Sequence, residues 1–598
     1  MTGLLRNHEM GSALVRGAAD DAPGMGDRET YFHQTSRRLR FFTHNFMNLR
    51  FIFVIALGLF LGTSANAASK SSPHPNILLI LADDLGYSDL GCYGSEIHTP
   101  NLDALAKNGL RFTQFDNAAR CWPSRAALMT GYYAQQVHRD ALPGLGGGGS
   151  GVRQNWARLL PDFLRPLGYR SYHSGKWHID GMPLENGFDH SYRVDDQDRH
   201  FGPKVHWLDD EKLPPIEPGA NYYGSIAIAD HAIRCLKEHA EKFPERPFFE
   251  YLAFTVPHFP IQAPPEDIAK YRDTYRDGWD ALRKQRWERM KKMKLLDAKL
   301  SPLDPVTVPS WNLSPGALNE RIGSNEVARA VAWQDLTHEQ QQFQAAKMAV
   351  HAAMVDRMDQ EIGRVLAQLR AMKALNNTVI FFLSDNGASA EQMIRGDGHD
   401  PAAPIGSAKT FLGIGPGWSS VANTPLRLHK SWVHEGGIST PLIVHWPDGI
   451  TAHGQLRMNP GHAIDLAPTI LELAGGKKPE NWNGQPIPPA PGLSLVPVLK
   501  KDGTVAHEYL WWFHSGNRAI RMGDWKLVSK GEEAPWELYN LARDRSETTD
   551  LAAKFPEKAR KLEQAWTKHL EEFSALAARD APEEKEGKKS LRKKESAN

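Results

Sequence analysis

Short apolar runs alternate with amphipathic stretches between about residues 75 and 475. Three of these runs consist almost entirely of Ile, Leu, Val and Phe, a composition typical of strands buried on both faces of a parallel sheet. At 346–372, apolar residues recur every three or four positions and mark one face of a helix. The alternation predicts an α/β domain over 75–475 whose large, mainly parallel sheet is flanked by helices. The predicted strands are Asn76–Ala82, 169–173, 247–256, Thr378–Ser384 and 441–446.

Two further regions interrupt or follow this pattern. Residues 268–345 are rich in Trp, Arg and Pro and are interpreted as an insertion. Two interpretations are open for its Trp279, Trp287 and basic run. They form a substrate wall, or they form a solvated helical face, which is the usual role of a charge run. Beyond a Pro-rich linker, residues 490–577 predict a smaller C-terminal subdomain of antiparallel sheet plus helix. Residues 579–598 are charged and lack aromatics, which predicts a disordered tail.

The first 67 residues have the features of an N-terminal extension and a secretory signal. Residues 51–62 are apolar without interruption, arginines precede them, and Ala65-Asn66-Ala67 offers a small-residue cleavage site. The run is shorter than the roughly 18 residues of a membrane-spanning helix. We therefore expect export to the periplasm or outside the cell without a stable membrane anchor. A buried helix or an anchor is the alternative, and either Met1 or Met47 starts the chain.

Composition and charge narrow the classes of function. The 598 residues include 71 Lys and Arg against 70 Asp and Glu, a net charge of +1. Nucleic-acid-binding proteins normally carry a basic excess, so no nucleic-acid partner is expected. Three cysteines are too few for a disulfide framework, and their odd number leaves at least one unpaired. The oligomeric state stays open.

Polar side chains follow four of the predicted strands. Ligands of open α/β sheets bind beyond the carboxyl ends of the strands, so parallel strands bring these groups to one site. An acidic pair alone is better explained by a turn or a helix cap than by a metal site. Two pairs at two buried strand ends favour a hard cation, Ca²⁺ or Mg²⁺, over zinc. The groups concerned are Asp83, Asp84, Lys176, His178, His258, Asp385 and Asn386.

The run Cys121-Trp122-Pro123-Ser124-Arg125 carries a second kind of chemistry. It resembles the C-x-P-S-R motif of the type I sulfatases, in which a maturation enzyme oxidises the cysteine to Cα-formylglycine. Further segments resemble the family's two metal-binding segments, its G-K-W-H and histidine segments, its Lys-x(4)-Glu-Gly-Gly segment and its C-terminal subdomain. Together they span about residues 75–575. The resemblance implies an arylsulfatase-like member with the alkaline-phosphatase-like fold.

The resemblance also implies a role for each candidate residue. One Ca²⁺, with Mg²⁺ as the less favoured ion, is bound by Asp83, Asp84, Asp385, Asn386 and the modified residue 121. Arg125 holds the formylglycine, and His178 handles the proton of its second hydroxyl. The sulfate oxygens are bound by Lys176, His258 and Lys430. The segment before Lys430 differs from the Gly-rich segment that is common in relatives. Arg427 is therefore the alternative residue for binding the sulfate at this position.

The expected reaction is the hydrolysis of a sulfate ester to an alcohol and inorganic sulfate. Attack at sulfur builds negative charge on the oxygens, which the cation, two lysines and an arginine stabilise. The hydrated aldehyde offers one hydroxyl for attack and a second to expel sulfate, which a plain serine or cysteine lacks. The physiological ester stays open between an aryl sulfate and a sulfated carbohydrate. The partners implied are this ester and the formylglycine-generating enzyme.

Two alternatives remain at this point. A phosphodiester or phosphonate monoester hydrolase of the same superfamily would share the metal pocket. A degenerate relative would only bind sulfated glycans, although every expected polar position is occupied. The sequence also leaves open whether the Gly-rich loop 144–151 and the insertion shape the pocket.

Overall fold

The computed structural model describes residues 74–579. The chain divides into two units, 1–68 and 69–598, and all described residues belong to the second. The predicted leader lies outside the described residues, as does the predicted tail except for its first residue. None of the described helices is long and apolar enough to cross a bilayer.

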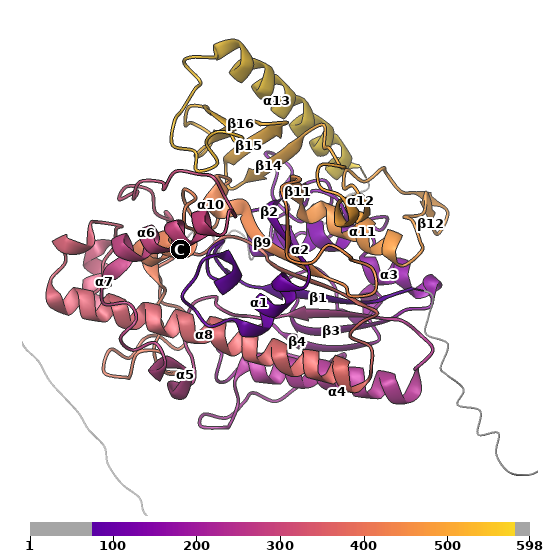
Figure 1. Ribbon diagram of the computed structural model, residues 1–598, viewed down its shortest axis with the longest axis horizontal. Coiled ribbons are helices and arrows are strands. Elements are labelled where there is room, and N and C mark those ends of the chain that lie inside the picture. Colours follow the sequence, from indigo (N-terminus) through magenta and orange to yellow (C-terminus); the bar gives the residue numbers. More distant parts are fainter. Residues whose placement is uncertain (1–73, 580–598) are drawn as a thin grey trace, which may run out of the picture. The chain divides into compact units, whose positions relative to one another are not determined.

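An eleven-stranded mixed sheet forms the centre of the described part (Figure 1). Its order is β10-β2-β9-β8-β1-β7-β3-β4-β5-β6, with β11 beside β2. The five central strands β8, β1, β7, β3 and β4 are parallel to one another, which confirms the predicted fold class. The strands are β1 Asn76–Ala82, β2 Leu110–Asp116, β3 Arg170–Lys176, β4 His190–Val194, β5 His206–Leu208, β6 Glu211–Lys212, β7 Phe248–Ala253, β8 Thr378–Ser384, β9 Ser439–His445, β10 Gln455–Arg457 and β11 Gly461–His462.

One predicted strand differs from the expected parallel arrangement. The run expected at 441–446 begins at Ser439 as β9, and it is antiparallel to both β8 and β2. All seven of its residues are buried. A strand covered on both faces reads as a continuous apolar run whichever way it points, so the pattern alone does not set its direction.

Helices cover both faces of the sheet and divide the core in two. Along β1, Leu78 and Ile80 join the core formed with α1, α4 and α8, while Ile77 and Leu79 join the core formed with α2, α3 and α11. This alternation follows from the two-residue period of a strand. The helices are α1 Pro100–Lys107, α2 Cys121–Thr130, α3 Leu160–Leu164, α4 Gly224–Lys242, α5 Pro265–Ala269, α6 Gly278–Lys292, α7 Pro315–Arg321, α8 His338–Ala371, α9 Gly415–Ala422, α10 Glu435–Ile438, α11 Leu466–Leu473 and α12 Val496–Lys500.

A second sheet follows near the C-terminus of the described part. Its four antiparallel strands are β14 Leu510–His514, β15 Asn517–Met522, β16 Trp525–Ser529 and β17 Glu537–Asn540. The helix α13, Pro556–Ala578, packs across β15 and β16 (Figure 1). The predicted antiparallel sheet with its closing helix is confirmed, and β17 is a strand that the sequence pattern did not predict.

The insertion over 268–345 is only in part a solvated helical face, because Lys291, Lys292 and Lys294 of the basic run are exposed whereas other residues of α6 are buried. Trp279, near the start of α6, is buried among Trp333 and Trp418, with ring centroids 4.7 and 5.5 Å away. On the same helix, Arg286 is fully buried and binds Asp89 at 2.7 Å and Glu96 at 2.8 Å. Charged residues can therefore line the buried side of a helix when they are paired, which a composition-based interpretation misses.

Removing the buried arginine is expected to destabilise the whole molecule. Arg286→Leu leaves Asp89 inside the protein without its guanidinium, so we expect the free energy of unfolding to fall by about 3 kcal/mol. Arg276→Leu, which breaks the exposed pair with Asp273 in the same insertion, is the matched control and should cost at most about 1 kcal/mol. Denaturant unfolding of both variants measures the difference, and equal losses would contradict the assignment.

Candidate active site

The ends of four parallel strands meet at one place. Asp83 and Asp84 follow β1, Asp385 and Asn386 follow β8, His258 lies beyond β7, and Lys176 ends β3. Their closeness follows from the pairing of β1 with β7 and β8 and of β3 with β7. All six side chains are buried. A Cβ on Gly387 would stand 1.9 Å from the Gly436 carbonyl oxygen, so the loop after β8 needs glycine there.

Cys121 reaches this place from the side, as the first residue of the ten-residue helix α2. Its side chain is buried, with 3% exposure. One turn later, Arg125 donates from Nε to Asp385 Oδ2 over 2.9 Å and from Nη1 to the Lys176 carbonyl oxygen over 2.8 Å. This guanidinium therefore ties α2 to the ends of β8 and β3.

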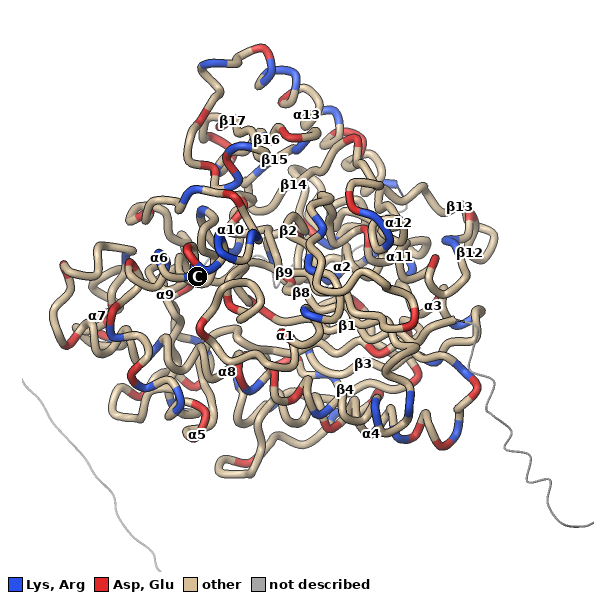
Figure 2. Tube along the Cα trace, in the orientation of Figure 1, with Lys and Arg blue, Asp and Glu red and all other residues tan. Residues whose placement is uncertain are grey.

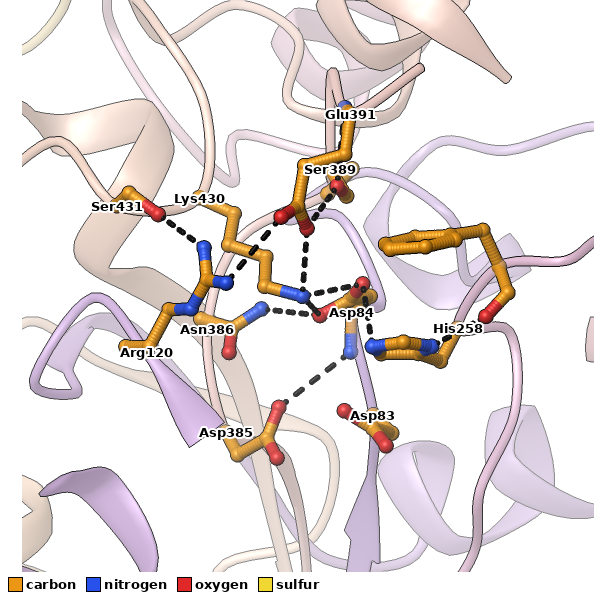
Figure 3. Close-up of polar contacts among 12 residues, drawn as sticks. Asp83, Asp84, Arg120, His258, Asp385, Asn386, Ser389, Glu391, Lys430 and Ser431 are labelled. Carbon is orange, nitrogen blue, oxygen red and sulfur yellow. Dashed lines mark hydrogen bonds and ion pairs between the residues drawn. The ribbon is translucent and has the colours of Figure 1, made fainter. Parts of the chain in front are cut away.

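Two lysines neutralise the acidic pair after β1. Lys176 Nζ lies 2.6 Å from Asp83 Oδ2. Lys430 Nζ lies 2.8 Å from Asp84 Oδ1 (Figure 3). Arg427, the fallback for Lys430, instead binds Glu537 in the second sheet. Acidic and basic residues are interspersed along the rest of the trace (Figure 2). The cations at the site are thus placed by local ion pairs and not by a basic face.

The donor set fits a hard cation. One ligand atom from each of Asp83, Asp84, Cys121 and His258 lies within 4.8 Å of the others. Asn386 adjoins this cluster and donates to Asp84 Oδ1 over 2.7 Å. Among the described residues, the buried Asp83 Oδ1 and Asn386 Oδ1 have no hydrogen-bond donor. Buried oxygens of this kind are the ligands that Ca²⁺ prefers.

The geometric cluster differs in one respect from the predicted ligands. His258 belongs to it, with Nε2 3.8 Å from Asp84 Oδ2, whereas the sequence suggested a sulfate-binding role for this histidine. Asp385, a predicted ligand, is placed beside the cluster by the Asp84 amide, which lies 3.4 Å from its Oδ1. The structure therefore brings together every predicted metal ligand, with one more donor among them.

Burial and neighbouring charges shift the ionisation of these groups in opposite directions. Burial, followed by the charge of Asp83, raises the pKa of Asp385 above its ordinary range. Although burial opposes it, the Lys176 ammonium holds the pKa of Asp83 well below its ordinary range. Two carboxylates this close separate their titrations, which makes one of them the better proton acceptor.

The histidine after β3 is held neutral. Burial, reinforced by the charges of Lys176 and Arg125, lowers the pKa of His178 well below its usual value. Its Nδ1 has no hydrogen-bond partner among the described residues. A neutral imidazole with a free ring nitrogen is able to accept a proton.

Four non-glycine residues with left-handed backbones lie in or next to the site motifs. Asp84, Ala119, His178 and Ser431 all have left-handed backbones, with φ between 54° and 80°. Such conformations cost non-glycine residues energy and persist where the surrounding structure enforces them, most often at functional sites. Four of them around one cluster are an independent mark of a functional site.

Several residues at the site were missed by sequence reasoning. Glu391 is a buried carboxylate that binds Lys430 at 3.0 Å and Arg120 at 3.2 Å (Figure 3). Glu391 follows the same strand as Asp385, and Arg120 directly precedes Cys121. Their closeness in sequence to the two motifs could therefore have indicated that they belong to the site. His514 contacts the ring of Trp122 from the second sheet, at 5.6 Å between centroids, and nothing local in the sequence indicates that contact.

Comparison with known proteins agrees with this geometry. The sulfatase family model matches residues 75–476, and a model described as N-sulphoglucosamine sulphohydrolase, C-terminal, matches 427–575. An uncharacterized sulfatase of Schizosaccharomyces pombe is 32% identical over 556 residues, which cover 85% of this chain and 96% of that protein. The arylsulfatase of Klebsiella aerogenes is 30% identical over 472 residues, which cover 74% and 95%.

A solved structure extends the similarity to three dimensions. The crystal structure of Ps i-CgsB in complex with k-i-k-neocarrahexaose has a TM-score of 0.58 and 25% identity. The match covers 85% of this chain and 94% of that one. Together with the strand-end cluster and the motif at Cys121, these matches establish that the chain belongs to the sulfatase family of the alkaline-phosphatase-like superfamily and is a sulfuric ester hydrolase.

Proposed function

We propose that the protein hydrolyses sulfate esters through a formylglycine formed from Cys121, with one bound Ca²⁺. The observation that carries the proposal is the position of Cys121. Its sulfur lies within 4.8 Å of donor atoms of Asp83, Asp84 and His258, at the N-terminus of a helix. The side chain at position 121 therefore adjoins both a cation site and a partial positive charge.

The unmodified thiol is poorly suited to attack. Burial raises the pKa of Cys121 to about 12, although Lys176 and Lys430 act in the other direction. At neutral pH only about one thiol in 10⁵ would then be ionised, and the thiolate is the reactive form. This supports a different nucleophile at position 121, which the hydrated aldehyde of formylglycine would supply.

The oxygen donors support Ca²⁺, with Mg²⁺ as the less favoured ion. Asp83, Asp84, Asp385 and Asn386 would hold it together with the modified residue 121. When bound, the ion would supply Lewis-acid stabilisation of the charge that develops on the sulfate oxygens. His258 shares the cluster but is not proposed as a ligand of the ion.

The remaining polar residues divide the work of binding and proton transfer. Lys176 and Lys430 would bind the sulfate oxygens, and Arg125 would fix residue 121 through its contacts with Asp385 and the end of β3. His178, held neutral by burial, would accept a proton from residue 121. Burial lowers the pKa of His258, but the charge of Asp84 opposes this shift and favours the protonated form, from which His258 is proposed to pass a proton to the leaving alcohol.

The substrate class is proposed from the relatives. One is named an arylsulfatase, and the solved neighbour was crystallised with an oligosaccharide. We infer that this chain takes an aryl sulfate or a sulfated carbohydrate.

A panel of esters tests the proposal. We expect release of inorganic sulfate from 4-nitrophenyl sulfate or from sulfated sugars, with kcat/KM at least about tenfold higher than for phenyl phosphonate and phosphodiester substrates, because the cationic cluster is set for a sulfate monoester. Ion chromatography measures sulfate. Faster turnover of the phosphorus esters would favour the related hydrolases, and no turnover would favour a glycan-binding relative.

Export and maturation belong to the same proposal. We infer that residues 1–67 form an extension and signal, that 75–475 and 490–577 form the catalytic domain and the C-terminal subdomain, and that a formylglycine-generating enzyme acts on Cys121. N-terminal sequencing of the mature protein from its native cells tests the cleavage site.

A further inference from the structure

The insertion brings one tryptophan to the edge of the site. Trp311 is 41% exposed, more than any other tryptophan among residues 74–579. Exposed tryptophans usually lie loosely on the surface, yet its Nε1 donates to Glu391 over 2.8 Å. Glu391 also binds Lys430 through its other oxygen, at 3.0 Å. A single buried carboxylate thus joins this exposed ring to a lysine of the catalytic cluster.

The turn that carries Trp311 is fixed to the protein by backbone contacts. The Asn312 side chain donates to the Ala390 carbonyl over 3.0 Å and accepts from the Gln392 amide over 2.9 Å. The Leu313 amide donates to the Gln392 carbonyl over 2.9 Å. The residues on both sides of Glu391 therefore hold the turn, and the ring is presented to solvent in a set position.

Two further planar groups continue from Trp311 towards Cys121. The guanidinium of Arg120 lies 5.1 Å from the Trp311 ring and 5.3 Å from the Trp122 ring. We call Trp311, Arg120 and Trp122 the stacked wall. Arg120 is held at this place by Ser431, at 2.6 Å, and by Glu391 (Figure 3). Its Nε has no acceptor among the described residues.

The far end of the wall is supported from two other regions. The Trp122 ring meets His178 at 5.6 Å, and its Nε1 donates to Asp140 over 3.3 Å. A Cβ on Gly149 would stand 3.5 Å from the ring, which places the Gly-rich loop beside it. Trp122 and Arg120 are only partly buried, in contrast to Cys121. The wall therefore leads from the buried position 121 to the exposed ring of Trp311.

We propose that the stacked wall is a subsite for the ring of the departing alcohol, with Trp311 as a specificity-determining residue. The inference rests on the proposed function, because a sulfate bound by Lys430 directs the alcohol part of the ester outwards past Trp311. The exposed ring of Trp311 can bind a flat ring by stacking, and the Arg120 guanidinium supports it through its own contact with that ring. The ligand class is an ester whose alcohol carries a ring, either aryl or pyranose.

Truncation of Trp311 tests the subsite. In Trp311→Ala we expect kcat/KM to fall about tenfold for 4-nitrophenyl sulfate, for galactose 6-sulfate or for both, since stacking is lost. Inorganic sulfate is the ring-free probe, and its inhibition constant should change by less than about twofold because Lys430 stays in place. Loss with the aryl ester alone identifies an aryl substrate, and loss with the sugar alone identifies a pyranose.

Two variants separate stacking from other effects. Trp311→Phe keeps a ring but loses the bond to Glu391, and it should retain kcat/KM within about threefold. Trp536→Ala is the matched control. Trp536 also lies under an arginine, Arg518 at 4.3 Å, and donates to a glutamate, Glu563 of α13, at 2.9 Å. It should leave kcat/KM unchanged.

Three results would overturn the subsite. They are unchanged kcat/KM for both esters in Trp311→Ala, an equal weakening of inorganic sulfate, or a loss in Trp311→Phe as large as in Trp311→Ala. The second and third results would mean that Trp311 only positions Glu391 and Lys430 and does not contact the substrate. Failure of the proposed function is distinct, because the unaltered protein would then release no sulfate from any ester of the panel.

Discussion

Replacing Cys121 with alanine is expected to abolish turnover, lowering kcat by about 10⁴-fold or more, because the nucleophile itself is removed. The fold should persist, since Cys121 opens α2 and most of that helix packs through later residues. The same position gives a chemical readout. In protein from its native host, the tryptic peptide with residue 121 should be about 18 Da lighter than the thiol form, as conversion of a thiol to an aldehyde requires.

A second buried cysteine provides the control. Cys235 lies in α4 with 2% exposure, and burial likewise raises the pKa of its thiol. Cys235→Ala should retain kcat within about twofold, and its peptide should keep the mass of the thiol. Activity near the original level in Cys121→Ala, or an unmodified thiol at position 121 in active protein, would refute the nucleophile assignment.

Removal of the cation is expected to have the next largest effect. Exhaustive chelation should lower kcat/KM by about 10³-fold, because a bound divalent ion contributes several kcal/mol of transition-state stabilisation. Ca²⁺ should restore activity better than Mg²⁺, given the carboxylate and amide oxygens around Asp83 and Asn386. Activity that is indifferent to chelation would count against the site.

Thermal unfolding gives a readout that does not depend on turnover. A ligand at 100 times its dissociation constant stabilises the folded state by about 2.7 kcal/mol, so Ca²⁺ should raise the melting temperature of the chelated protein. Asp385→Asn keeps the size of the side chain but removes a charge, and it should reduce this shift. Asp304→Asn alters a carboxylate that binds only its own loop and should leave the shift unchanged.

The sequence predicted the sheet well where a run of apolar residues was followed by polar ones. Thr378–Ser384 is a strand over the predicted residues, and Asp385 and Asn386 lie beside Asp84 as expected. This succeeded because parallel pairing follows from the helices between strands. The direction of β9 was not predictable, since a doubly covered strand has the same composition either way.

The parts of the site that sequence reasoning missed depend on contacts between distant segments. Glu391 is recognisable only from its four cationic or donor neighbours, which are Lys430, Arg120, Trp311 and Ser389. Within the insertion, Trp279 attracted notice because of its basic neighbours but is buried, while Trp311 reaches the site. Composition does not distinguish the buried tryptophan from the exposed one, because the position of each ring is set by packing against residues elsewhere in the chain.

The burial of Cys121 has a consequence for the order of events in the cell. If a maturation enzyme has to take residue 121 and its neighbours into its own active site, the folded chain hinders it, because position 121 is 3% exposed and begins a formed helix. If residue 121 is converted to formylglycine, conversion and folding therefore compete in time. A chain that folds before conversion would then stay inactive. The fraction of active protein in a preparation would therefore depend on the relative rates of conversion and folding, and not on the amount of protein made.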